Sequence, residues 1–247
     1  MIPHILRLRQ DVSPCRSPSG SQAVCMAHDT PFSVLPADFA ASLFGEARAV
    51  ALARNQMLFA AGDPCDGCYR IVEGLLKVTA AAPSRRERIL AILGPGAIVG
   101  ELSMIDGAPR SASVTAIRES RLRFVTRAAF ETFAQANPQV YRHISALLAR
   151  HLRDNNDALV ATSFLSVKGR AARALLSLAD AFGEDVGSGR ILIHQKVSQS
   201  DLAAMAGIAR ENLSRILQEW VRNALIKRLA SYYCVEDKAA LEREANE

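Results

Sequence analysis

The stretch SQSDLAAMAGIARENLSRILQEW, residues 198–220, decides the fold of the C-terminal part of the chain. Ser198, with Asp201 three residues later, forms a helix-capping signature in front of LAAMA. Gly207 predicts the end of this first helix, because glycine readily adopts the left-handed backbone of a helix terminus. A second helix begins near Ala209, so the stretch predicts two short helices joined by a tight turn.

The second of these helices has an apolar and a polar face. The apolar face follows the i, i+3, i+4, i+7 spacing that buries one side of a helix, and it comprises Leu213, Ile216, Leu217 and Trp220. The polar face lies at the N-terminal end, the part of a helix-turn-helix that enters a DNA major groove, and it comprises Arg210, Glu211, Ser214 and Arg215. The pattern therefore predicts a DNA-reading helix.

The side chains on this face suit base recognition. An arginine fork holds guanine O6 and N7 together, and a carboxylate accepts from cytosine N4. The alternative is a solvated face with a Glu211–Arg215 ion pair of a few tenths of a kcal/mol. The chain has a net charge of +5, yet residues 164–247 hold 12 Lys or Arg against 11 Asp or Glu. DNA affinity must therefore come from the arrangement of charges, not their number.

The same stretch resembles the recognition helix of the cyclic-AMP receptor and fumarate-nitrate regulator family, which carries R-E-x-x-x-R in this frame. Residues 196–235 resemble the family's winged helix-turn-helix, with wing strands at Ile226–Arg228 and Tyr232–Val235. Ala209 stands where the family often has a serine. The resemblance implies a TGTGA-like half-site, and the candidate DNA-binding residues are Arg210, Glu211, Arg215, Ser198, Gln199, Asn212 and Ser214.

Upstream, short apolar runs alternate with glycine turns, which is typical of a jelly roll or small β-barrel. A short helix is expected from about Phe32 to Phe44, before these runs. The expected strands are Gln56–Ala60, Tyr69–Val78, Ile89–Leu93, Ala112–Ile117 and Arg121–Thr126.

The stretch ILGPGAIVGELSMIDGAPRSASV, residues 92–114, contains groups that suit a nucleotide. A helix beginning after a glycine offers N–H groups to an anion, an arginine offers a charge-assisted fork, and a carboxylate accepts from a ribose hydroxyl. A buried Glu–Arg pair in a β-barrel is equally explained as structural. The candidates are Gly100, Glu101, Leu102, Arg110 and Ser111.

This G-E-L and R-S pattern resembles the phosphate-binding cassette of cyclic-nucleotide-binding domains, and residues 45–247 align with the same regulator family without large gaps. The resemblance implies that Arg110 and Ser111 bind a cyclic phosphate and that Glu101 binds the ribose 2′-hydroxyl. The expected effector is cyclic AMP, with cyclic GMP as the alternative, and no metal is expected.

A long helix is predicted from Pro138 to about Thr162. Its heptad positions are Tyr141, Leu148, Asn155 and Thr162, and Ser145, Leu152 and Leu159, a spacing that indicates pairing with a second copy. The family resemblance places the base contacts at Asn155 and Asn156, where the cyclic-AMP receptor commonly has Thr-Ser. Asn155 alternatively sets the register of the dimer, and the choice between cyclic AMP and cyclic GMP stays open.

The expected fold class is α+β, in four segments. These are a flexible extension (1–30), a jelly-roll sensor domain (31–137), a dimerisation helix (138–163) and a winged helix-turn-helix domain (164–247).

The expected partners are double-stranded DNA, a second copy and RNA polymerase. Translation from Met26 is an alternative to Met1. No window approaches the ~20 apolar residues of a membrane span, and a cytoplasmic location is expected.

Other classes of protein receive less support from the sequence. Cys65 and Cys68 form a C-x-x-C, but Cys68 is also explained as a small buried strand residue. A haem or iron–sulfur sensor of the same fold, a regulator without a ligand, and a cyclic-nucleotide-binding subunit without DNA binding remain alternatives. The five histidines are scattered and no nucleophile–base pair stands out, so we do not expect an enzyme.

Overall fold

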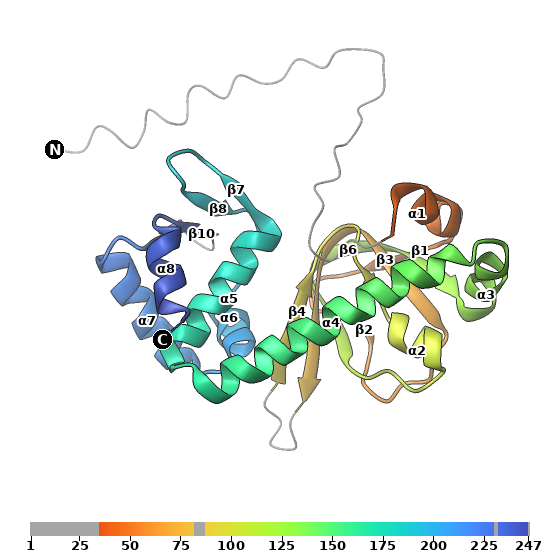
Figure 1. The fold of residues 1–247 in the computed structure, drawn as a ribbon, viewed down its shortest axis with the longest axis horizontal. Coiled ribbons are helices and arrows are strands. Elements are labelled where there is room, and N and C mark those ends of the chain that lie inside the picture. The colour runs from red at the N-terminus through yellow and green to blue at the C-terminus, as the bar shows by residue number, and fades with distance from the viewer. Residues whose placement is uncertain (1–34, 82–86, 230–231, 247) are drawn as a thin grey trace, which may run out of the picture.

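The computed structural model describes residues 35–81, 87–229 and 232–246, arranged as two lobes joined by one long helix (Figure 1). The expected extension at 1–30 lies outside the described residues, as do Phe32 and the rest of the start of the first expected helix. Among the described residues no helix has the length and apolar character needed to cross a membrane.

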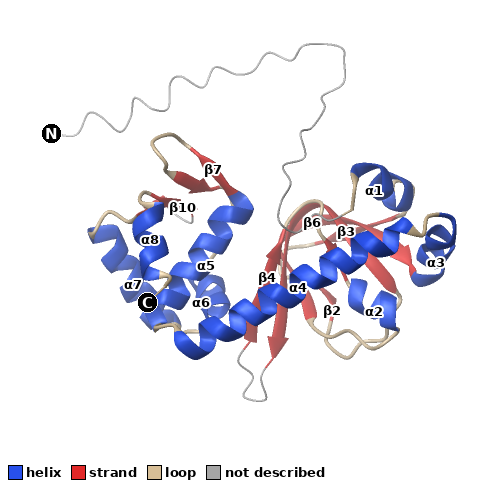
Figure 2. Cartoon of the chain, viewed as in Figure 1, coloured by secondary structure: helices blue, strands red, loops and turns tan. Residues whose placement is uncertain are grey.

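The first lobe, the expected sensor domain, is built on one six-stranded sheet flanked by short helices (Figure 2). Its sheet has the order β1-β6-β3-β4, with β2 pairing to β6 and β5 to β3, all antiparallel. The elements are α1 (Ala37–Phe44), β1 (Arg48–Leu52), β2 (Met57–Phe59), β3 (Gly67–Ala81), β4 (Glu87–Leu93), β5 (Ile98–Val99), α2 (Glu101–Asp106), β6 (Ser113–Thr126) and α3 (Arg127–Ala136).

This lobe confirms the jelly-roll prediction and corrects its details. The runs expected as two strands at Ala112–Ile117 and Arg121–Thr126 form the single strand β6, because its long ladder with β3 continues through three register shifts. Strand β1 was not expected, although its pairing with β6 from Arg48 to Leu52 is regular. The described strands form an open ladder with β1 and β4 at its edges, not a closed barrel.

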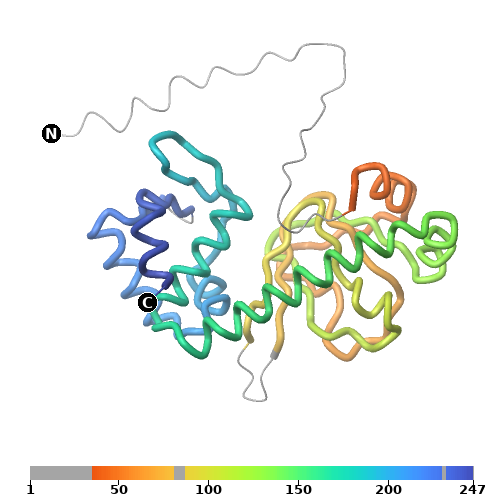
Figure 3. The backbone as a smooth tube through the Cα atoms, viewed as in Figure 1, coloured from red at the N-terminus to blue at the C-terminus, as the bar shows by residue number. Residues whose placement is uncertain are grey.

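The connecting helix α4 (Gln139–Phe164) follows Pro138 and runs diagonally past the sheet to the second lobe, as the tube in Figure 3 shows. Its first half is anchored in the sensor domain by the buried residues Val140, Ile144 and Leu147. Its second half leaves large apolar side chains exposed. The exposed fractions are 62% for Leu152, 67% for Leu159 and 79% for Phe164.

The second lobe is a winged helix-turn-helix. Its elements are α5 (Val167–Phe182), β7 (Gly183–Asp185), β8 (Ile191–Ile193), α6 (Gln199–Ala206), α7 (Arg210–Arg222), β9 (Ile226–Leu229), β10 (Tyr232–Val235) and α8 (Lys238–Glu244). Ser166 caps α5, and the strands form a sheet with the order β7-β8-β10-β9.

The two lobes touch in this structure. Ile89 and Ile92 of the sensor domain belong to one apolar cluster with α5, α6 and α7, and Lys77 Nζ lies 3.7 Å from Asp201 Oδ1 on α6. Across the same junction, Arg88 donates to Thr162 Oγ1 at 2.9 Å. Strand β4 is therefore packed directly against the first helix of the helix-turn-helix.

Candidate functional site: a buried arginine and an exposed helix end

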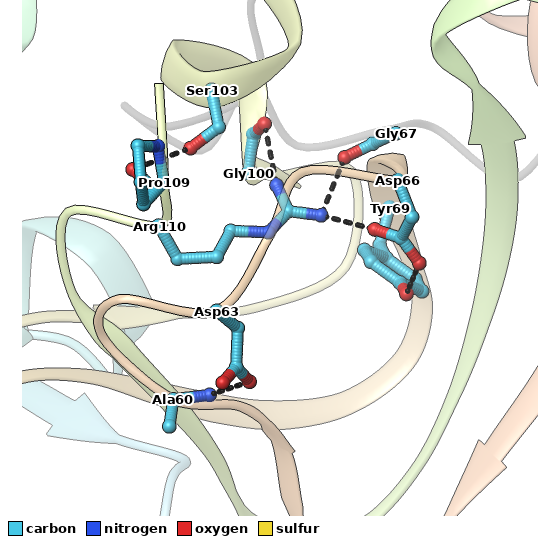
Figure 4. Close-up of polar contacts among 9 residues, drawn as sticks. All are labelled: Ala60, Asp63, Asp66, Gly67, Tyr69, Gly100, Ser103, Pro109 and Arg110. Atoms are coloured by element: carbon cyan, nitrogen blue, oxygen red, sulfur yellow. Dashed lines mark hydrogen bonds and ion pairs between the residues drawn. The ribbon is translucent and has the colours of Figure 1, made fainter. Parts of the chain in front are cut away.

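Arg110 is the centre of the candidate ligand site. Arg110 is only 3% exposed, and its guanidinium lies between two loops (Figure 4). Nη1 donates to the Gly100 carbonyl at 2.9 Å, and Nη2 donates to the Gly67 carbonyl at 2.7 Å and to Asp66 Oδ1 at 2.5 Å. The guanidinium carbon also lies 4.3 Å from the centre of the Phe59 ring. The charge of Arg110 is thus fixed in place before any ligand binds.

The local backbone explains why this arrangement needs glycine. Gly100 has a φ of 82°, a left-handed conformation that favours glycine, and a Cβ there would overlap the Arg110 guanidinium. The loop carrying Arg110 is held by Arg110 N–H donating to the Asp63 carbonyl at 2.9 Å, and by Ser103 Oγ donating to the Pro109 carbonyl at 3.3 Å. Backbone contacts therefore set the position of the side chain.

Asp66 holds two groups at once. Besides the Arg110 contact, its Oδ2 accepts from Tyr69 Oη at 3.1 Å. Burial raises the pKa of Tyr69 to about 12, and the neighbouring Asp66 carboxylate adds to the rise. The side chain of Asp66 remains about half exposed, so it is a screened rather than a buried counter-ion.

Two features leave Arg110 able to bind an anion. Its Nε is buried and has no hydrogen-bond partner within the described part of the chain. Ser111, the next residue, is exposed at the edge of the same opening. A buried N–H without a partner costs free energy, so an anion that accepts from it would gain affinity. The residues present therefore fit a phosphate group.

A cleft of about 1110 Å³ opens beside Arg110 and extends along α4 to α5. Six candidates border it, namely Gly100, Glu101, Leu102, Arg110, Ser111 and Asn155. Glu101 is buried at the start of α2 and faces α4, where His151 Nδ1 lies 3.3 Å from its Oε1. Asn156 is the exception: it is exposed, and the helical spacing places it on the α4 face that carries Leu152 and Leu159.

Cys68 has the burial of a structural residue rather than the exposure of a reactive thiol. Cys68 is 1% exposed on β3, as expected for a small buried residue, and Cys65 is partly buried beside it. Burial raises the pKa of the Cys68 thiol, and the negative charge of Glu101 raises it further. Cys15 and Cys25 lie outside the described residues. Within residues 35–81, 87–229 and 232–246, no group of three or more His, Cys, Asp or Glu forms a metal-binding cluster.

The second candidate site is the N-terminal end of α7. Leu213, Leu217 and Trp220 are buried, as predicted, while Arg210, Glu211 and Arg215 are exposed. Arg215 Nη2 donates to Asn212 Oδ1, and no ion pair joins Arg215 to Glu211 among the residues described. The i, i+4 ion pair that was the alternative to a DNA-reading face is therefore not formed, and Arg215 contacts a residue one position closer.

The helix in front of α7 has the predicted caps. Ser198 Oγ accepts from Asp201 N–H at 3.0 Å and donates to Asp201 Oδ2 at 2.6 Å. Gly207 ends α6 with a φ of 64°. Ala209 precedes α7 without a side-chain cap. Gln199 and Ser214 are partly exposed, so polar groups from both helices are accessible on this lobe.

Together these features define a class of protein: a sheet domain with a buried arginine whose surroundings fit an anion, joined by a long helix to a winged helix-turn-helix. Family models agree with both halves. The cyclic nucleotide-binding domain matches residues 49–137, and the Crp-like helix-turn-helix domain matches residues 169–244.

Known relatives extend along most of the chain. It is 33% identical over 205 residues to a CRP-like cAMP-activated global transcriptional regulator of Mycobacterium tuberculosis, covering 83% of this chain and 91% of the relative. It is 31% identical over 192 residues to the cyclic AMP receptor protein of Thermus thermophilus, covering 78% and 85%. The structure of FixK2 from Bradyrhizobium japonicum has the same fold, with a TM-score of 0.72, 21% identity and coverage of 80% and 96%. The chain belongs to the Crp/Fnr family of transcription regulators.

The sequence did not single out Asp66, Phe59 or His151. Asp66 lies between the two cysteines of the C-x-x-C, and this motif was interpreted through its cysteines alone. Phe59 ends a short strand that reads as ordinary core. The sequence could have indicated His151, since this residue lies four positions before Asn155 and therefore on the same side of the helix.

Proposed function

We propose that this regulator is a homodimer that binds a cyclic nucleotide and, when it does so, recognises a TGTGA-like palindrome. The observation that carries the proposal is the Arg110 guanidinium, which is buried, fixed by three acceptors and left with a buried Nε–H without a partner among the described residues. A cyclic phosphate supplies the missing acceptor. The charge-assisted contact favours an anionic ligand over a neutral one.

The other cleft residues complete a nucleotide site. Ser111 adds a hydroxyl for the phosphate, and Glu101 accepts from the ribose 2′-hydroxyl, while Gly100 and Leu102 line the opening. Asn155 meets the base from α4 of the same chain. We favour cyclic AMP because the two similar relatives are named for it. Cyclic GMP is the alternative, since an asparagine amide accommodates it as well.

The exposed face of α4 supports a dimer. Leu152 and Leu159 lie on one side of the helix, and exposed apolar side chains of this size usually mark an interface. Asn156 lies on that same face, so pairing of two α4 helices would direct it toward the cleft of the partner subunit. Both asparagines then contribute to each site, one from each chain.

DNA recognition is assigned to α7. Arg210, Glu211 and Arg215 read base edges, and Ser198, Gln199, Asn212 and Ser214 supply polar contacts around them. In a two-fold dimer the two reading helices face half-sites about 34 Å apart. RNA polymerase is a further proposed partner, because a regulator that acts at a promoter would contact it there.

The test is DNA binding to a TGTGA palindrome, measured by fluorescence anisotropy while cyclic AMP or cyclic GMP is added. We expect cyclic AMP to increase affinity for the palindrome over a scrambled duplex by at least about tenfold, an effect of about 1.4 kcal/mol. Arg110→Ala should abolish this response. Equal affinity with and without either nucleotide would contradict ligand gating, and equal affinity for both duplexes would contradict the assigned half-site.

A further inference from the structure

His151 lies against the carboxylate that the proposed function assigns to ribose. Its Nδ1 is 3.3 Å from Glu101 Oε1, and the exposed fractions of the two side chains are 29% and 8%. Glu101 belongs to α2 of the sensor domain, whereas His151 belongs to α4. The pair therefore joins the ligand loop to the helix that continues to the DNA-binding lobe.

Several charged side chains surround this pair. Arg150 and Asp154 flank His151 on α4, Arg88 borders the cleft from β4, and Arg110 and Asp66 lie on the loops beside Glu101. Burial raises the pKa of the neighbouring Cys68 on β3, which moves that thiol further from neutrality. Histidine is the side chain whose charge ordinarily changes between about pH 5 and 8.

A second histidine of the described chain, His143, also lies near Glu101. His143 borders the small apolar cavity beneath α2, together with Glu101 and Phe130. Its ring centre lies 5.4 Å from that of Phe39. Because it shares the helix with His151 but contacts an aromatic ring, it provides a matched control.

We infer that His151 is a specificity-determining residue of the nucleotide site, whose proton competes with the ribose 2′-hydroxyl for Glu101. An imidazolium makes a charge-assisted hydrogen bond to a carboxylate, which is stronger than the bond from a neutral hydroxyl. Protonated His151 therefore holds Glu101, and neutral His151 releases it to the sugar. Discrimination between ribose and 2′-deoxyribose falls as the pH falls.

This inference rests on the proposed function, because it assumes that a cyclic nucleotide enters the cleft. It also gives the ligand a direct action on α4. Binding of ribose to Glu101 separates that carboxylate from His151, which lies one helical turn before Asn155. The sugar and the base then act on neighbouring turns of the same helix.

The experiment compares cyclic AMP with 2′-deoxy cyclic AMP by isothermal titration calorimetry on the full chain, at about pH 5.5 and about pH 8. The ratio of the two dissociation constants isolates the 2′-hydroxyl from effects of pH on stability or on the phosphate contact. We expect the preference for ribose to be about three- to tenfold larger at the higher pH. His151→Gln, which has no titrating proton, should give the same ratio at both pH values.

His143→Gln should keep the wild-type pH dependence. A wild-type ratio that is constant, or that rises as the pH falls, would overturn the inference while leaving nucleotide binding intact. The same holds if His151→Gln retains the wild-type dependence. Absence of binding by both nucleotides at both pH values would instead overturn the proposed function, and this inference with it.

Discussion

Arg110 and Arg215 show two ways of using the same side chain. Arg110 is 3% exposed and donates to acceptors on two separate loops, so its guanidinium has one position. Arg215 is exposed, and within the described residues its side chain donates to Asn212 on its own helix. The side chain of Arg110 is packed inside the fold, whereas the side chain of Arg215 lies on the surface.

The roles proposed for the two arginines account for the difference. A small anion gains most from donors that are fixed in advance, because little entropy is then lost on binding. A DNA-reading arginine must reach a base edge whose position is set by a separate molecule, and an exposed, flexible side chain allows that adjustment. Substitution of Arg110 should therefore change both stability and ligand binding. Substitution of Arg215 should change only the preference for one DNA sequence over another.

The largest effect is expected for Arg110→Ala. The change removes the Arg110 side-chain donor from the Gly67 and Gly100 carbonyls, of which Gly100 keeps the Met104 N–H at 3.3 Å, and we expect a loss of about 1–3 kcal/mol in the free energy of unfolding. The half-exposed Asp66 adds little to this cost, because water screens its charge. Nucleotide affinity should fall by at least about a hundredfold. Urea denaturation and calorimetry measure the two effects separately.

Arg48→Ala is the matched control, since Arg48 also stacks on an aromatic ring of the sensor domain, 4.8 Å from the centre of Phe124, but does not border the cleft. It should retain nucleotide affinity. If Arg110→Ala kept wild-type stability and affinity, the contrast between a fixed and a flexible arginine would be wrong.

A smaller effect, confined to DNA, is expected for Arg215→Ala. The free energy of unfolding should change by less than about 0.5 kcal/mol, because an exposed side chain with one local contact is removed. Preference for the TGTGA palindrome over a single-base variant should fall by about 1–3 kcal/mol, while weak non-specific binding persists. Competition gel shifts measure this preference.

Arg222→Ala, in the last turn of the same helix, removes one positive charge away from the reading end. It should weaken binding to both duplexes equally. Retention of palindrome preference by Arg215→Ala would contradict the assignment of this residue to base recognition.

The DNA-binding lobe could be predicted almost completely from the sequence. Helix caps, a glycine stop and an apolar stripe are local signals, and Ser198, Gly207 and Trp220 have the predicted structural roles. Each of these signals involves residues within a few turns of one another, so no knowledge of distant contacts was needed.

The sensor domain could be predicted less fully because its determinants are distant in sequence. Asp66 meets Arg110 across 44 residues, and His151 meets Glu101 across two different elements. No local period reports such a pairing. Strand β6 was divided for the same reason, since its continuity depends on a ladder with β3 and not on its own alternation.

The smallest effect is expected for Asp66→Asn, which tests the support around the fixed arginine. Two backbone carbonyls still hold Arg110, so nucleotide affinity should change by less than about threefold. The clearer effect is on Tyr69. Its pKa of about 12 is raised first by burial and then by Asp66, so removing the carboxylate should lower the pKa toward its ordinary value while burial keeps it above that value.

The pH dependence of stability should move with the pKa of Tyr69. A raised pKa in the folded chain gives a contribution that is complete below the unfolded pKa of about 10 and is lost as the pH rises toward about 12. In Asp66→Asn this loss should be complete at a lower pH. Spectrophotometric titration of tyrosine, with Tyr69→Phe subtracted to remove the other three tyrosines, measures the shift. An unchanged Tyr69 titration would mean that the carboxylate does not hold the phenol.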